Sequence, residues 1–258
     1  MKIGIVGYGY VGQAIGELME RHDLIINDPS KGSRGDVSQC DFVFVCVPTP
    51  MAPDGSCDTS IVEGVVKSIG PHPIIIIKST VAPDTTMRLE VENDVKVVFS
   101  PEYAGESSYW SSHAFHKKMV ETPFFVFGGR KDLTAECVDL FLPICGPEKR
   151  YIQTSATAAE LAKYAENSFY ALKIMFCYEF AKICQAHAED WNEVREIWLA
   201  DPRINQMHTA VFAENKQAFG GKCLPKDLSA IIHSASAYGH DAKLLAEVKR
   251  INDEMGRT

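Results

Sequence analysis

A chain of 258 residues is long enough for one large domain or two modest ones. The formal net charge is −8 and no run of Lys and Arg exceeds two residues, so we expect no nucleic-acid partner. No uncharged apolar run approaches the ~18 residues of a membrane span, and the start of the chain does not resemble a signal peptide, so we expect no membrane association.

The cysteines and histidines point to a reduced, metal-independent protein. Eight cysteines form no CxxC pair and several lie inside apolar runs, which predicts reduced thiols and a cytoplasmic protein. His113-x-x-His116 comes closest to a metal-binding spacing among the eight histidines. We interpret it as polar surface and expect no metal.

The first half of the chain alternates short β-branched apolar runs with helical stretches. The expected strands are residues 2–6, 24–27, 42–47, 74–78, 95–99 and 124–127. The expected helices are residues 12–21, 61–69 and 133–142. Continuous apolar strands separated by helices indicate a parallel sheet that is covered on both faces. We therefore predict a doubly wound α/β domain of the Rossmann type over residues 1–154.

The pattern changes near residue 154. Residues 157–188 contain no Gly or Pro and repeat apolar side chains at helical spacing, which predicts one long helix. The segments that follow are a helix at 191–199, an irregular stretch at 201–226, a helix at 227–238 and another helix from 242 onward. Residues 155–258 are thus expected to form a long central helix and a small all-helical domain.

A glycine pattern follows the first strand and opens the first helix, Gly7-x-Gly9-x-x-Gly12. Its glycines allow a tight turn, close approach of the backbone to a pyrophosphate, and helix–strand packing. Asp28 ends the next strand, where a carboxylate accepts hydrogen bonds from an adenosine ribose and repels a 2′-phosphate. The prediction is a domain that binds NAD, with NADP as the alternative because Lys31 and Arg34 lie nearby.

Four polar residues fall just beyond the ends of predicted strands: Thr49, Thr80, Glu102 and Glu106. The carboxyl ends of the strands face the ligand crevice in a doubly wound sheet. Each residue taken singly could belong to an ordinary turn. Their shared location predicts that at least two of them line the cofactor site.

The helical half holds two further candidates. Lys163 and Asn167 are spaced i, i+4 and project from one face of the long helix, for which a solvated face is the alternative. Cys223 lies on an irregular stretch just before a helix, and its thiolate is favoured by Lys222, Lys226 and the helix start. A thiol in that setting is a candidate nucleophile, whereas cysteines inside apolar runs are expected in the core.

Six motifs in one order resemble those of the UDP-glucose 6-dehydrogenases, a family of nucleotide-sugar dehydrogenases. They are Gly7-x-Gly9-x-x-Gly12, Val47-Pro48-Thr49-Pro50, Lys78-Ser79-Thr80-Val81, Ser100-Pro101-Glu102 with Glu106, Glu160-Leu161-x-Lys163-x-x-x-Asn167, and Phe219-Gly220-Gly221-x-Cys223-Leu224-Pro225-Lys226-Asp227. The resemblance implies that a sugar C6 alcohol is oxidised to the carboxylate with two NAD. Cys223 would carry first a thiohemiacetal and then a thioester.

The resemblance also implies a role for each matching residue. Lys163 and Asn167 would hold the developing oxyanion, and Asp227 would orient or activate water. Glu106 would assist hydrolysis of the thioester, and Thr80 would position the reacting groups. The positions that match NAD contacts are Gly7, Gly9, Tyr10, Val11, Gly12, Asp28, Thr49 and Lys226.

Substrate binding and assembly follow from the same resemblance. Glu102 matches a substrate-binding position, and Arg203 resembles an arginine that the family presents across a dimer interface to the neighbour's sugar site. The helix at 157–188 corresponds to the family's dimerisation helix. A homodimer is therefore expected, since a helix of that length needs a partner to cover its apolar stripe.

The chain departs from the family pattern after the catalytic cysteine. The family has a second α/β domain there, which binds much of the nucleotide diphosphate, whereas only 35 residues follow Cys223. Two hypotheses stay open. One is a compact dehydrogenase whose substrate is held by the dimer, by residues 205–218 or by a separate chain that supplies the domain. The other is an NAD(H)-binding module without sugar oxidation.

Overall fold

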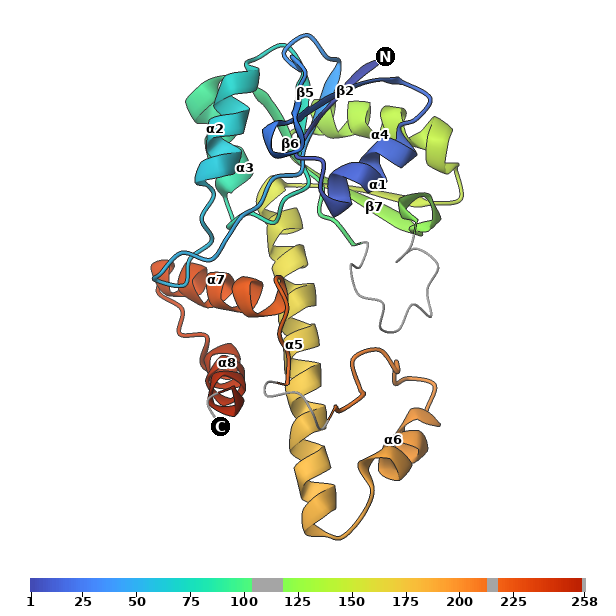
Figure 1. The fold of residues 1–258 in the computed structure, drawn as a ribbon, viewed down its shortest axis with the longest axis vertical. Helices are drawn as coiled ribbons and strands as arrows, with labels where there is room; N and C mark the ends of the chain where they lie inside the picture. Colours follow the sequence, from blue (N-terminus) through green and yellow to red (C-terminus); the bar gives the residue numbers. More distant parts are fainter. Residues whose placement is uncertain (104–117, 213–217, 257–258) are drawn as a thin grey trace. The chain divides into compact units, whose positions relative to one another are not determined.

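The computed structural model describes residues 1–103, 118–212 and 218–256 of the chain (Figure 1). The chain divides into two compact units. Unit 1 comprises Met1–Ala52 and Cys57–Lys163, and unit 2 comprises Pro53–Ser56 and Tyr164–Thr258. Unit 1 thus ends inside the long helix that begins at Ala156, and the domain boundary expected after residue 154 stays a prediction.

Unit 1 is built on an eight-stranded sheet in the order β3-β2-β1-β4-β5-β6-β7-β8. The strands are β1 (Lys2–Val6), β2 (Asp23–Asp28), β3 (Ser33–Arg34), β4 (Phe42–Val45), β5 (Ile74–Ile77), β6 (Lys96–Phe99), β7 (Phe124–Gly128) and β8 (Arg150–Thr154). The neighbours among β1, β2, β4, β5 and β6 all pair in parallel. This confirms the doubly wound α/β fold.

The sheet also contains two antiparallel pairings outside this parallel core. β3 is antiparallel to β2, and β7 is antiparallel to β6 before β8 returns to a parallel pairing. An apolar run shows that a strand is buried but carries no sign of its direction, because both pairings bury the same side chains. The helix α3 (Thr85–Asn93) and the strands β3 and β8 were also missed, since each is short or polar.

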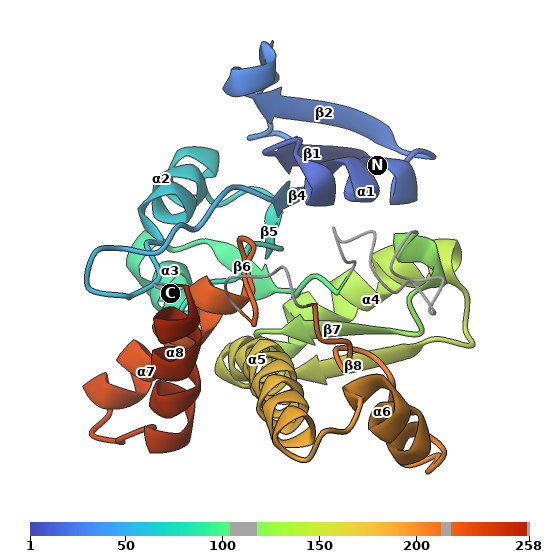
Figure 2. The same cartoon turned by 60° about the horizontal axis from the view of Figure 1, so that its bottom comes forward.

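Helices cover both faces of the sheet, as Figure 2 shows. One face packs against α1 (Tyr10–Leu18) and α4 (Lys131–Cys145), and the other against α2 (Ser60–Ile69) and α3. Successive strand side chains point to opposite faces, so each apolar strand supplies both cores. In β5, for example, Ile74 and Ile76 enter one core while Ile75 and Ile77 enter the other. Unit 1 also contains the single turns η1 (Pro29–Lys31) and η3 (Met119–Glu121).

The chain changes direction across the sheet beside β1. It runs from β1 to β2 and β3 at one edge, then returns to β4 on the other side of β1. The register pairs Val6 with Asn27 and Val45, so the carboxyl ends of β1, β2 and β4 lie level. Such a point is where open α/β sheets bind ligands, because the loops beyond the two central strands diverge there.

Unit 2 is helical. The long helix α5 (Ala156–Ala186) buries Ala171, Ile174 and Tyr178 in a core that it shares with α7 (Leu224–Ala237) and α8 (Lys243–Met255). A second core joins α5 to α6 (Trp191–Leu199). α7 begins three residues earlier than expected, because a proline in the first turn is compatible with a helix start.

Residues 53–56 leave the sheet unit to join unit 2. There the Asp54 carboxylate lies 3.6 Å from the His233 ring nitrogen Nε2 on α7. Within the described residues, no helix is both long enough and apolar enough to cross a membrane.

Candidate active site

The glycine turn after β1 packs so closely against backbone atoms that Gly7 and Gly12 leave no room for a side chain. Gly7 has a φ of +84°, and a Cβ on Gly12 would lie 2.1 Å from the Gly7 carbonyl oxygen. The start of α1 therefore packs directly on the turn. Gly9 is the N-cap of α1 and has no side chain to accept from the first-turn N–H groups. A Cβ on Gly9 would meet nothing within 4 Å, so the turn is open on that side, as approach by a phosphate requires.

Asp28 stands at the end of β2 beside this turn. Its Oδ2 accepts from the Tyr8 N–H at 2.7 Å, and its Oδ1 accepts from the Ser30 hydroxyl at 2.6 Å. The Ser30 hydroxyl first, and then the Tyr8 N–H, lower the pKa of this carboxyl group, so Asp28 is ionised at neutral pH. Lys31 donates to the Tyr8 carbonyl oxygen at 2.6 Å. These hydrogen bonds thus hold a carboxylate beside the glycine turn.

The segments that follow β4 and β5 are tied to each other. The Thr49 hydroxyl donates to the Thr80 carbonyl oxygen at 2.7 Å, and the Ser79 hydroxyl donates to the Val47 carbonyl oxygen at 2.6 Å. The structure therefore brings Thr49 and Thr80 together beyond the carboxyl ends of adjacent strands.

A buried cation joins the ends of β5 and β6. The Lys78 Nζ lies 3.4 Å from Glu102 Oε2 and donates to the Pro101 carbonyl oxygen at 3.2 Å. Lys78 was given no role from the sequence, although a lysine that directly follows four isoleucines was a signal. It fixes the backbone that carries Glu102. Glu106, His113 and His116 lie outside the described residues.

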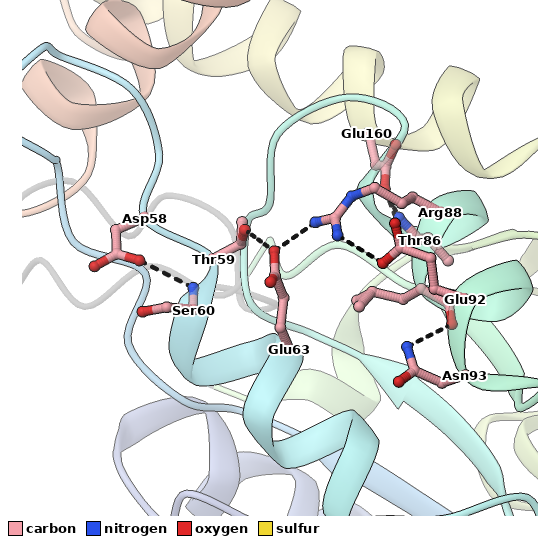
Figure 3. A network of polar contacts seen from close by, with 10 residues as sticks. Asp58, Thr59, Ser60, Glu63, Thr86, Arg88, Glu92, Asn93 and Glu160 are labelled. Atoms are coloured by element: carbon pink, nitrogen blue, oxygen red, sulfur yellow. Dashed lines mark hydrogen bonds and ion pairs between the residues drawn. The ribbon is translucent and has the colours of Figure 1, made fainter.

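The first turns of α5 are anchored on the start of α3 (Figure 3). Glu160 is fully buried, and its carboxylate accepts from the Asp84 N–H at 2.7 Å and from the Thr86 N–H and hydroxyl at 2.9 and 2.6 Å. Burial raises the pKa of Glu160, and these hydrogen bonds oppose the rise. α3 follows the loop that carries Thr80, so Glu160 links that loop to α5.

Figure 3 also shows how the same anchor extends to α2: Arg88 on α3 pairs with Glu63 on α2 and with Glu92 one turn further along α3. Lys163 lies one turn beyond Glu160, with its Nζ 4.8 Å from the ring centroid of Tyr103. Lys163 and Asn167 are both buried, so the alternative of a solvated helix face is wrong.

In unit 2 the start of α7 carries a polar cluster. Cys223 is the N-cap and is exposed, and its carbonyl oxygen accepts from the Asp227 N–H at 2.8 Å. The Asp227 carboxylate is buried, accepts from the Asn167 amide at 2.5 Å and pairs with the Lys226 Nζ at 2.6 Å. Asn167, Lys226 and Asp227 are thus brought together one helical turn after the thiol.

Two further residues complete the description of unit 2. Asn252 on α8 bonds both backbone groups of Phe219, a contact that was missed from the sequence. The signal was a polar residue one turn after the buried Val248, on the apolar face of α8. Arg203 is exposed, and its guanidinium folds back onto Asp201 of its own turn at 2.6 Å. The structure does not bring Arg203 to the cluster around Asp227.

The chain is similar to known dehydrogenases over nearly all its length. It is 29% identical to the putative UDP-glucose 6-dehydrogenase YtcA of Bacillus subtilis and 27% identical to the UDP-glucose 6-dehydrogenase AglM of Haloferax volcanii. These matches cover 98% of the chain and 68% and 70% of the two relatives. A solved UDP-glucose dehydrogenase from Pyrobaculum islandicum superposes with a TM-score of 0.83 at 26% identity, over 99% of this chain and 68% of that one.

Two sequence models of one family match separate parts of the chain. The NAD binding domain of the UDP-glucose/GDP-mannose dehydrogenase family matches residues 29–138, and its central domain matches residues 157–254. Together they match well over half of the chain. The first match confirms NAD as the cofactor of the sheet domain. From these matches and the fold, we conclude that the chain belongs to the UDP-glucose/GDP-mannose dehydrogenase family.

Proposed function

We propose that the chain oxidises the C6 alcohol of a nucleotide sugar to a carboxylate, with two NAD as oxidants and the Cys223 thiol as nucleophile. The observation that carries the proposal is the exposed thiol at the N-cap of α7, one turn before the buried Asp227 with its partners Asn167 and Lys226. A thiolate is favoured at a helix N-terminus and next to a lysine. Membership of the family supports the same chemistry.

The glycine turn and Asp28 hold the cofactor in this proposal. The turn at Gly7, Gly9 and Gly12 receives the pyrophosphate at the start of α1, with Tyr10 and Val11 in its first turn. Asp28 accepts hydrogen bonds from the adenosine ribose; Thr49 and Lys226 match further contacts. Bound NAD supplies an acceptor for one hydride in each of two oxidations.

The oxidation proceeds in two balanced halves. Loss of a hydride from C6 and of a proton from its hydroxyl gives the aldehyde, and the Cys223 thiolate adds to the carbonyl carbon to form a thiohemiacetal. Loss of a second hydride and the hydroxyl proton gives a thioester. Water then cleaves the carbon–sulfur bond, which releases the carboxylate and restores the thiol. The covalent bond keeps the aldehyde from escaping between the two halves.

The polar residues around these steps act on charge and water. Lys163 and Asn167 stabilise the oxyanion that forms when sulfur or water adds to the carbonyl carbon, an effect commonly worth about 3–4 kcal/mol per donor. Asp227 orients water, Glu106 assists hydrolysis of the thioester, and Thr80 positions the reacting groups. Glu102 binds the sugar on the ordered backbone that Lys78 fixes.

The assembly that we propose is a homodimer through α5. A stripe of exposed apolar side chains follows one face of this helix in unit 2: Phe169, Phe176, Phe180 and Ile183. Monomeric proteins rarely expose such a contiguous patch, whereas a symmetric partner would cover it. Arg203 is exposed and thus available to a neighbouring copy. A cytoplasmic location stays a prediction.

The test is an NADH assay with the purified chain and a panel of UDP- and GDP-linked sugars. We expect two NADH for each sugar consumed, and no more than a trace of the second NADH from the Cys223→Ser variant. A Cys184→Ala variant is the matched control, because this thiol is buried in the α5–α6 core. Its NADH yield should equal that of the unmodified chain.

Two outcomes would contradict the proposal in different ways. One NADH per sugar with release of the aldehyde would remove the covalent role of Cys223. No NADH from any sugar, together with NAD binding by calorimetry, would leave an NAD-binding module in place of the dehydrogenase.

A further inference from the structure

The segment that carries Cys223 is held at both of its ends by buried asparagines. We call residues 219–227 the thiol segment. At its far end Asn167 on α5 donates to Asp227, and at its near end Asn252 on α8 contacts Phe219. Between these points residues 220–223 are all exposed. The thiol therefore lies on surface backbone whose position depends on its two anchors.

The near anchor is a complete pair of hydrogen bonds. Asn252 Oδ1 accepts from the Phe219 N–H at 2.9 Å, and Asn252 Nδ2 donates to the Phe219 carbonyl oxygen at 3.0 Å. Both residues are almost fully buried, at 1% and 4% exposed. A primary amide is the neutral side chain that can donate and accept in this way at once. Removing it would leave two buried backbone groups without these partners, which is costly.

The chain between the anchor and the thiol is short. Three residues separate Phe219 from Cys223, and one of them, Gly221, has a φ of +77° that turns the backbone into the start of α7. Glycine adopts this conformation without strain but does not itself hold it. The direction of the turn is therefore fixed by the Phe219 anchor on one side and by α7 on the other.

We propose that Asn252 is a positioning residue for Cys223, which holds the thiol segment so that the thiol stays at the N-cap of α7. This inference rests on the proposed role of Cys223 as nucleophile. It assigns to the apolar face of α8 a part in the chemistry, although Asn252 itself is buried. A displacement of about 1 Å of a reacting group commonly costs up to a hundredfold in rate.

The test compares Asn252→Leu with two controls on the same helix. Asn252→Leu keeps the branching and the number of side-chain heavy atoms, with methyl groups in place of the amide oxygen and nitrogen, and removes both hydrogen bonds. Val248→Ala deletes a buried apolar side chain from the core of unit 2 and leaves both Asn252–Phe219 hydrogen bonds in place, and Asp253→Asn removes a part-buried ion pair with Lys249. Asn252→Asp is the milder variant if the leucine variant does not fold, since it keeps the acceptor for the Phe219 N–H.

Two readouts separate positioning from folding. Without NAD or sugar, we expect Asn252→Leu to slow alkylation of Cys223 at pH 7 by about two- to fivefold, because the thiolate loses its fixed place at the helix start. In turnover, kcat should fall by about tenfold to a hundredfold while KM for NAD and sugar stays within about a factor of two. Both controls should keep the original alkylation rate and kcat.

Alkylation of Cys223 at the original rate in folded Asn252→Leu or Asn252→Asp would overturn the inference. An equal slowing in Val248→Ala would do the same, since it would trace the effect to general loosening of unit 2. The alkylation readout needs no turnover. A chain that makes no NADH from any sugar would therefore disprove the proposed function while the inference about Asn252 is still decided by the thiol.

Discussion

The two units differ in what they leave at their surfaces. Unit 1 closes its fold with its own side chains, because the strands β4 and β5 are buried along their whole length and helices cover both faces of the sheet. Unit 2 leaves an apolar stripe along α5 and an exposed thiol at Cys223. Unit 1 thus buries the strands that surround the cofactor turn, whereas unit 2 leaves an aromatic stripe and a thiol exposed.

The largest expected difference between the units is in thiol chemistry. Burial raises the pKa of Cys46 in unit 1 to about 12 from an ordinary 9.0, so at pH 8 it holds about a thousandfold less thiolate than an unperturbed thiol. Brief treatment with iodoacetamide followed by peptide mapping should label Cys223 first. The buried Cys145 and Cys177, with pKa values raised to about 11, serve as internal controls. Earlier labelling of any of these three would break the comparison.

The close packing of the glycine turn predicts that one methyl group added there disrupts the cofactor site of unit 1. In Gly12→Ala the new Cβ would meet the Gly7 carbonyl oxygen at 2.1 Å, so the glycine turn must move. We expect the dissociation constant for NAD, measured by calorimetry, to rise at least about a hundredfold, because the turn supplies the pyrophosphate contacts.

The matched control for this change is Gly64→Ala at an exposed position of α2, where a Cβ meets nothing within 4 Å. That variant should bind NAD normally and gain up to about 1 kcal/mol of unfolding free energy from its higher helix propensity. NAD binding by Gly12→Ala with unchanged affinity would show that the turn does not hold the cofactor.

We expect a substitution within the exposed apolar stripe of α5 to weaken the proposed dimer. Phe176 lies in the centre of this stripe, with its ring 4.6 Å from that of Phe180 between centroids. Phe176→Asp should raise the dimer dissociation constant at least about thirtyfold, as loss of a central aromatic anchor does at other interfaces. Light scattering across a concentration series measures it. Met87→Asp, an equally exposed apolar site on α3, should leave the dimer intact, and a monomer in the unmodified chain would end the dimer proposal.

The smallest effect concerns the choice between NAD and NADP. Asp28→Asn should weaken NAD binding about tenfold, because a charged acceptor for the ribose is lost, and should narrow the preference over NADP. The pKa of Asp28 is lowered by Ser30 and Tyr8, so its ionised form is favoured above the unfolded value of 3.8 and is lost only as pH falls through the lower folded value.

NAD affinity should therefore be flat between about pH 5 and 8 in the unmodified chain. Asp36→Asn is the control, since the pKa of this acid is also lowered but by Ser38, away from the turn. A rise in affinity for NAD in Asp28→Asn would show that the carboxylate repels the cofactor instead of holding it.

The strands and the glycine turn of unit 1 were easier to predict from the sequence than the long-range hydrogen bonds and ion pairs of either unit. Runs such as Ile74–Ile77 reveal buried strands because every side chain is apolar, and the glycine spacing reveals the turn because each glycine answers a local steric demand. The direction of β7 was not predicted, since burial is the same in both pairings. The anchors Lys78, Glu160 and Asn252 were missed for a different reason.

These three residues bond partners between 22 and 76 positions away in the chain, and their local surroundings do not name those partners. In a helix of mixed composition, the sequence alone does not distinguish a buried glutamate such as Glu160 from a solvated one. What the sequence does show is a polar residue at a core spacing. For Asn252 that spacing, one turn after Val248, was the readable sign.

The excursion of residues 53–56 into unit 2 has a consequence for how the chain is made. Asp54 is synthesised long before its neighbour His233 on α7. Because domains fold as they emerge from the ribosome, the sheet can form before α7, the helix that Asp54 contacts, has been synthesised. A fragment that starts at Tyr164 lacks residues 53–56 and therefore does not contain all of unit 2. A protease that cuts the chain within residues 53–56 breaks a segment of unit 2 and also breaks the connection between the two parts of unit 1.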